Sequence, residues 1–285
     1  MVDREGAAPS APASAASAAS GQRRGGLTVG GGWRSAFGYW WTTYRRTWWG
    51  GFVSSFCAPL LYLGAMGYGL GRLVDAGPGG GIPGVDYVAF VAPGLLVATA
   101  MTTAVGESTY PVMGSIKWQR HYHAMLATPL GVPGVLGGHL VFVASRLVTV
   151  SVVYLLVASL LGALRSPWMV LGVPVAVLVG LAFAAPIFAF SALQDNDQGF
   201  NVLFRFLITP MFLFSGTFFP VEQLPGWMQP VAWATPLWHG VELSRSLSLG
   251  TTTAVTAVGH VGYLLLWVVG GAVVARWAFT RRLVS

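Results

Sequence analysis

The stretch FLFSGTFFPVEQLPGWMQPVAWATPLWHGVELSRSL, residues 212–247, decides how the rest of the chain is arranged. It begins as an apolar run and is then interrupted by a proline every five or six residues. Each proline removes a helical hydrogen-bond donor and restricts the residue before it, so only short helices fit between them. The prolines and the tryptophans between them are Pro220, Pro225, Pro230, Pro236, Trp227, Trp233 and Trp238. Because tryptophan prefers the boundary between water and lipid, these residues alone predict a loop anchored on a bilayer.

The composition places this stretch in a membrane protein. The chain is 54% hydrophobic and only 9% charged, whereas soluble domains carry roughly 25% charged residues. The net charge of +7 does not indicate nucleic-acid binding, because the arginines stand mainly at the ends of apolar runs and in short loops, where membrane topology needs them. The single cysteine, Cys57, rules out a disulfide framework or a cysteine metal site within this sequence. We therefore expect an all-α, polytopic membrane protein.

Six apolar runs are each close to the roughly 20 residues that cross a ~30 Å hydrocarbon core. They cover residues 51–71, 87–113, 135–163, 168–193, 201–218 and 255–278. Residues 1–32, rich in Ala, Ser and Gly, predict a disordered tail. Residues 33–49 mix aromatic side chains with arginines, which predicts either a helix lying in the headgroup layer or a simple flank of the first span.

The positions of Lys and Arg give the orientation, because cytoplasmic loops carry an excess of them. Arginines precede the first run, Lys117 and Arg120 follow the second, and Arg281 and Arg282 follow the sixth, whereas the alternate loops hold few. The protein is therefore predicted to lie in the plasma membrane with both termini in the cytoplasm. The proline-rich stretch then faces outward.

The order and spacing SGTFFP, then LP, then P-L-x-x-x-V-E-x-x-R resemble the signature of type-2 ATP-binding-cassette (ABC) permeases, and the resemblance extends over residues 33–282. The residues that carry it are Ser215, Gly216, Phe219, Pro220, Leu224, Pro225, Pro236, Leu237, Glu242 and Arg245. The resemblance implies an interfacial helix at 33–49, a coupling helix at 114–129 and outer re-entrant helices at 219–247, between the fifth and sixth spans. The nearest branch contains drug-resistance permeases and exporters of nodulation factors and lipooligosaccharides.

This resemblance also implies partners. Two permeases, copies or paralogues, would work with two ATPase subunits, which bind the ATP and Mg²⁺ and drive an amphipathic, lipid-linked or drug-like cargo outward. The chain itself is predicted to be no enzyme and to hold no cofactor. Its only lysine, Lys117, is flanked by Ile116 and Trp118, so it cannot belong to a phosphate-binding loop, which needs Gly-Lys followed by Ser or Thr.

The intracellular segment 114–129 is the predicted docking point for the ATPase. On a single helix, Ile116, Arg120 and His123 would share one face and Trp118, Tyr122 and Met125 another. The predicted contact residues are Lys117, Trp118, Arg120, His121, His123 and Met125. The alternative is an amphipathic flank resting on anionic lipid. His121 and His123 diverge on a helix and predict no metal site.

Three ionisable residues fall inside apolar runs, where they are costly: Glu107, Arg146 and Arg205. Chain direction places all three in the cytoplasmic halves of their helices. Glu107 is predicted to pair with one or both arginines across the bundle; alternatively, both arginines extend to the headgroups. A channel or secondary transporter remains the alternative function, and a membrane-embedded lipid-processing enzyme a more distant one, since the sequence offers few polar groups at mid-membrane and no paired acid and base.

Overall fold

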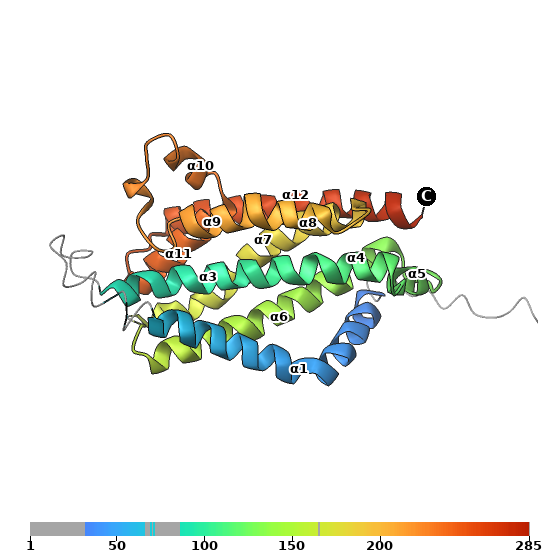
Figure 1. The fold of residues 1–285 in the computed structure, drawn as a ribbon, viewed down its shortest axis with the longest axis horizontal. Coiled ribbons are helices and arrows are strands. Elements are labelled where there is room, and N and C mark those ends of the chain that lie inside the picture. Colours follow the sequence, from blue (N-terminus) through green and yellow to red (C-terminus); the bar gives the residue numbers. More distant parts are fainter. Residues whose placement is uncertain (1–31, 66–68, 70, 72–85, 165, 285) are drawn as a thin grey trace, which may run out of the picture.

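The computed structural model describes the chain except residues 1–31, 66–68, 70, 72–85, 165 and 285. The predicted disordered tail and most of the loop after the first run therefore lie outside the described residues. All regular elements within the described part are helices, which confirms the all-α class (Figure 1). In chain order they are α1 Gly32–Gly64, α3 Tyr87–Ser108, α4 Tyr110–Lys117, α5 His121–Leu126, α6 Val132–Leu160, η3 Pro167–Leu171, α7 Gly172–Leu193, α8 Gln198–Leu203, η4 Phe204–Ile208, α9 Thr209–Phe214, η5 Val221–Gln223, α10 Gln229–Trp233, α11 Pro236–Leu249 and α12 Ala254–Leu283.

Four helical segments of the described chain are long and apolar enough to cross a membrane. They are Tyr87–Lys117, Val132–Leu160, Pro167–Leu193 and Ala254–Leu283. The predicted fifth span is shorter than expected, because Gln198–Phe214 reaches about 25 Å at 1.5 Å per residue, against a ~30 Å core. It ends where Gly216 adopts a φ of 84°, a left-handed conformation that glycine tolerates and that helices do not continue through. The count of six spans stays a prediction.

The segment predicted as an interfacial helix, 33–49, is helical and continuous with the element that follows it, and its position in the headgroup layer stays a prediction. The backbone of α1 continues as one helix from Gly32 to Gly64, and Figure 1 shows it bent along its length. Its first part packs closely on α6, because a Cβ on Gly138 would lie 2.7 Å from the carbonyl oxygen of Trp33. The aromatic run therefore packs partly against protein, and Ala36 and Trp40 are buried.

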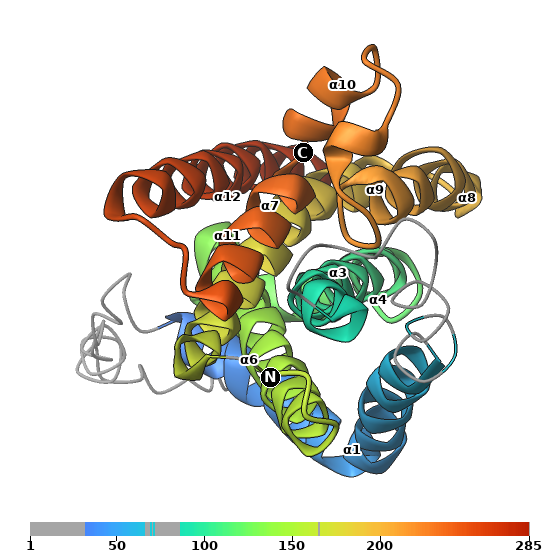
Figure 2. The ribbon, with the colours of Figure 1, turned by 90° about the vertical axis from the view of Figure 1, so that its left-hand side faces the viewer.

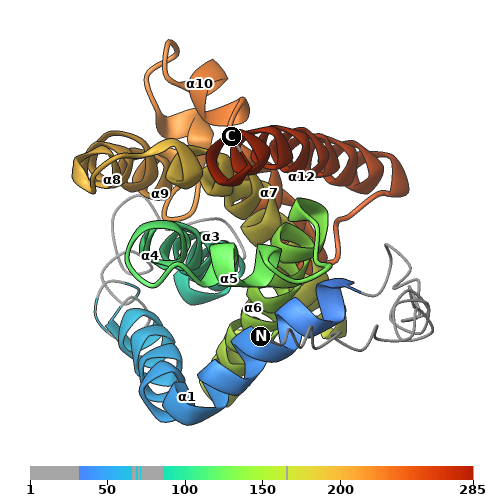
Figure 3. The ribbon, with the colours of Figure 1, turned by 90° about the vertical axis from the view of Figure 1, so that its right-hand side faces the viewer.

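The helix α7 forms the centre of the bundle, with α3, α6, α11 and α12 packed around it (Figures 2 and 3). Small residues bring these helices close together, as membrane bundles require. A Cβ on Gly271 of α12 would lie 2.6 Å from Pro186 Cδ of α7, and one on Gly240 of α11 would lie 2.8 Å from Val97 Cγ1 of α3. Side chains larger than hydrogen at these glycines would push the helices apart.

The predicted outer segment forms three short helices, η5, α10 and α11. Thr235 caps α11 by accepting from the amide of Trp238, and Pro236 occupies its first turn, where no donor is needed. Gly250 ends α11 with a φ of 70°, a glycine C-cap. α11 packs on α3, α7 and α12, whereas α10 lies at the periphery of the bundle (Figure 1).

Candidate coupling, charge and pocket sites

The single helix predicted over residues 114–129 is wrong. α4 ends at Lys117, and a turn separates it from α5, which covers only His121–Leu126. Arg120 lies in this turn with a φ of 52°, and a left-handed residue cannot continue a right-handed helix. The two faces predicted for one helix are therefore divided between two helices.

This break sorts the residues of the two predicted faces into exposed and buried ones. Trp118 is 65% exposed, while Tyr122 is fully buried. Arg120 and His123 are exposed, and they line a hollow of about 470 Å³ with Ile116, Lys117 and Arg282. The surface that α4 and α5 present is thus basic, with one exposed tryptophan beside it.

An aromatic cluster anchors α5 to the bundle. The hydroxyl of Tyr122 lies 2.5 Å from Nδ1 of His139 on α6, and burial raises the pKa of the Tyr122 phenol well above its ordinary value, so the phenol stays neutral. The His139 ring stacks on Trp40 of α1 at 4.0 Å, and the Tyr122 ring lies 5.4 Å from Phe279 of α12. The neighbouring His121 contacts the hydroxyl of Tyr39 at 2.9 Å. A displacement of α5 would therefore reach α1, α6 and α12 directly. Met125 is partly buried against the same core.

The sequence analysis did not single out Asp195, in the turn between α7 and α8. Its carboxylate accepts from Nη2 of Arg282 at 2.8 Å and lies 3.5 Å from Nζ of Lys117. The hydrogen bond from Arg282, followed by the charges of Arg282 and Lys117, lowers the pKa of Asp195. This carboxylate joins the ends of α4 and α12 to the turn that enters α8.

The intramembrane charges form a pair. Nε of Arg146 lies 3.1 Å from Oε1 of Glu107. The same guanidinium donates to the hydroxyl of Tyr44 at 2.5 Å and lies over the Tyr44 ring at 4.3 Å. The predicted third member, Arg205, is exposed on the π-helical turn η4 and makes no salt bridge within the described residues. The third group at the ion pair is instead Tyr44, which belongs to the aromatic run of α1 and contacts Arg146.

The residues of the SGTFFP and P-L-x-x-x-V-E-x-x-R stretches contact one another although 29 residues separate Gly216 from Arg245. The buried Arg245 donates to the carbonyls of Gly216 at 2.6 Å and Phe90 at 3.4 Å, and lies over the Phe90 ring at 3.8 Å. Glu242 lies 3.6 Å from Arg245 on the same helix.

The rest of the signature supports these contacts. The hydroxyls of Ser215 and Thr217 lie 3.3 Å apart. Phe219 packs against the small cluster of Val221, Leu224 and Ala232. Pro220 precedes η5, and the carbonyl of Pro225 accepts from Met228.

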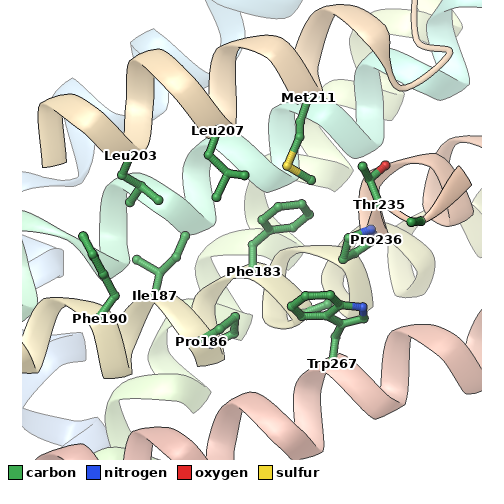
Figure 4. A pocket seen from close by; sticks show the side chains of 12 residues that line it. Phe183, Pro186, Ile187, Phe190, Leu203, Leu207, Met211, Thr235, Pro236 and Trp267 are labelled. Carbon is green, nitrogen blue, oxygen red and sulfur yellow. The ribbon is translucent and has the colours of Figure 1, made fainter. Parts of the chain in front are cut away.

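An apolar pocket of about 390 Å³ lies between α7, the α8–α9 segment, α12 and the start of α11 (Figure 4). Its walls include Phe183, Pro186, Leu207, Met211, Pro236 and Trp267. Phe183 is the twelfth residue of α7 and Trp267 the fourteenth of α12, so the start of α11 reaches the level at which both helices are half-way along. An adjoining hollow of about 250 Å³ lies under Trp227 and Val231.

Comparison with known proteins gives the class to which this architecture belongs. Residues 34–249, which make up most of the chain, match the ABC-2 type transporter family. The protein therefore belongs to this family and is a permease subunit of an ABC exporter. It is 34% identical to nodulation protein J of Rhizobium leguminosarum bv. viciae over 225 residues, 79% of this chain and 85% of that protein. It is 33% identical to nodulation protein J of Rhizobium meliloti, over 74% of this chain and 78% of that protein. It is 28% identical to a daunorubicin resistance ABC transporter permease protein, DrrB1, of Streptomyces coeruleorubidus, over 58% of this chain and 59% of that protein.

Proposed function

We propose that this permease moves an amphipathic, lipid-linked or drug-like cargo outward across the plasma membrane, and that a separate ATPase docks on the surface formed by Trp118, Arg120 and His123. The names of the relatives support the cargo class, since they concern nodulation and daunorubicin resistance. The apolar runs hold few charged side chains, which suits such a cargo better than a hydrated ion.

One observation carries the docking proposal: neighbouring residues of one short segment are divided between solvent and core. Trp118 and Arg120 are exposed, while Tyr122 is buried beside His139 and Phe279. A partner that binds the exposed side chains therefore pushes on a rigid aromatic cluster rather than on a loose loop. Exposed aromatic and arginine side chains are also those that most often dominate protein interfaces.

The docking proposal is tested by co-expression and co-purification with a candidate ABC ATPase, which is sought first among the genes that adjoin this one. Trp118→Ala combined with Arg120→Ala should abolish co-purification while the permease still inserts into the membrane. Trp227→Ala is a matched control, because Trp227 is 75% exposed at the other end of the bundle. If the double variant keeps full complex yield and full ATP turnover, the docking surface lies elsewhere. Loss of binding to anionic vesicles, with the complex intact, would support the lipid-flank alternative.

We also propose that α10 and α11 re-enter the membrane from the outside, with both termini of the chain in the cytoplasm. The position of Pro236 beside Phe183 and Trp267, half-way along two spanning helices, supports this. Single cysteines in a Cys57→Ser background test it. External labelling should be weak at Trp227 and Val231, because their exposed side chains would be surrounded by lipid in a re-entrant segment, and strong at Thr251 and Thr252. Uniformly strong labelling from Glu222 to Thr252 would show an ordinary exposed loop.

A further inference from the structure

The walls of the pocket in Figure 4 offer almost no hydrogen bonds. Thr235 and Trp267 are the lining residues with polar side-chain atoms. The Thr235 hydroxyl is already used, since it donates to the carbonyl of Ala232 at 2.7 Å and accepts from the amide of Trp238 at 3.2 Å. A buried water needs two to four polar partners, so water is not a stable occupant, and an ion would be left unsolvated.

Close packing on either side holds the pocket open. Gly271 fixes α12 against Pro186 of α7, and Gly240 fixes α11 against α3 and α7. The remaining wall is the α8–α9 segment, whose π-helical turn η4 carries Leu207 toward the pocket (Figure 4). Because these helices already touch at the two glycines, they cannot approach one another to close the pocket. An occupant must fill the space instead.

The length of the apolar surface matches a lipid tail. Along the α8–α9 segment, the pocket begins at Leu203 and the adjoining hollow ends at Ser215; both hollows share Leu207, Met211 and Thr235. The twelve steps from Leu203 to Ser215, at 1.5 Å each, give about 18 Å, a little over half of a ~30 Å hydrocarbon core. This is the reach of a chain in one leaflet.

We propose that the pocket and the adjoining hollow form one binding groove for a single acyl chain of a bilayer phospholipid. The chain packs between α9 and α12 and beneath Trp227 and Val231, and so becomes part of the contact between the short α8–α9 segment and the rest of the bundle. This site depends only on the protein's being embedded in a bilayer, and is independent of cargo and of ATPase docking.

Photo-crosslinking tests the proposal with the full-length chain. The protein is placed in phosphatidylcholine nanodiscs that contain a phosphatidylcholine with a diazirine in mid-chain, and adducts are located by peptide mass spectrometry. Adducts on the peptides that contain Phe183, Leu207 and Met211 should exceed those on the α6 face around Leu156, which is 60% exposed.

Leu207→Trp narrows the groove and should lower these adducts at least about threefold, since packing rather than water exclusion holds a chain inside a bilayer. Val269→Trp is the matched control, because Val269 is 61% exposed on α12 and lies outside the groove. If Leu207→Trp folds poorly, Met211→Trp is used instead, and it should lower the same adducts. Equal labelling of the groove and the α6 face, or crosslinks between two protein copies in place of lipid adducts, would overturn the proposal.

Discussion

Replacing Glu107 by glutamine is a direct test of the ion pair inside the bundle. Arg146 is 9% exposed and Glu107 is its carboxylate partner at 3.1 Å. Removing one partner of a buried pair typically costs about 3–5 kcal/mol, because the other charge stays buried. Two features reduce this figure here: the Glu107 side chain is 23% exposed, and Arg146 keeps its contacts with Tyr44.

The expected losses differ between two variants. In Glu107→Gln the amide oxygen still accepts from the charged Arg146, but the attraction between the two opposite charges is lost, so we expect a loss of about 1–2 kcal/mol. Glu107→Ala removes the acceptor as well and should cost about 2–4 kcal/mol. For domains somewhat smaller than this chain, 1 kcal/mol corresponds to about 2–4 °C in Tm. Glu107→Gln should therefore lower Tm by roughly 2–8 °C.

Thermal unfolding of the purified protein in detergent measures these shifts. Glu222→Gln is the control, because Glu222 is exposed and makes no salt bridge within the described residues. Replacing Glu107 and Arg146 together by leucine should recover most of the loss, since it leaves no unpaired charge. If Glu107→Gln and Glu107→Ala both have the same melting temperature as Glu222→Gln, the ion pair of Glu107 and Arg146 contributes nothing to stability and the reasoning fails.

Two further predictions concern the glycine contact and the aromatic anchor. Gly240→Ala should lose about 1–3 kcal/mol through overpacking against α3 and α7, whereas Gly226→Ala, with open space around it, should leave the melting temperature unchanged. Tyr122→Phe should cost about 1 kcal/mol for the lost hydrogen bond and Tyr122→Ala about 3–5 kcal/mol for the cavity, both read from thermal unfolding. Equal melting temperatures for Tyr122→Ala and the unaltered protein would show that the aromatic cluster does not anchor α5.

Much of the fold could be predicted because membrane spans depend on local composition. The predicted second run begins at Tyr87, where α3 begins, and the predicted third, fourth and sixth runs begin within a few residues of α6, η3 and α12. Glu107 and Arg146 could be matched because an isolated charge in an apolar run needs a partner at similar depth.

The errors have a different origin. Trp118 and Tyr122 were placed on one face because the helical period says nothing of a single left-handed residue such as Arg120. Asp195 and Tyr44 acquire their roles from partners on other helices, and no local pattern indicates those partners. The lone His139 in an apolar run was the signal that could have revealed the anchor beneath α5.

The contacts of Arg245 have a mechanical consequence. Its guanidinium holds carbonyls of α3 and of the Gly216 turn, so α11 cannot slide along α3 without leaving both acceptors, and the buried charge, unsatisfied. α3, α11 and the Gly216 turn should therefore travel as one rigid body through a transport cycle. Any change in the angle between α11 and α12 must then occur at Thr251–Thr253, the three non-helical residues that join the two helices.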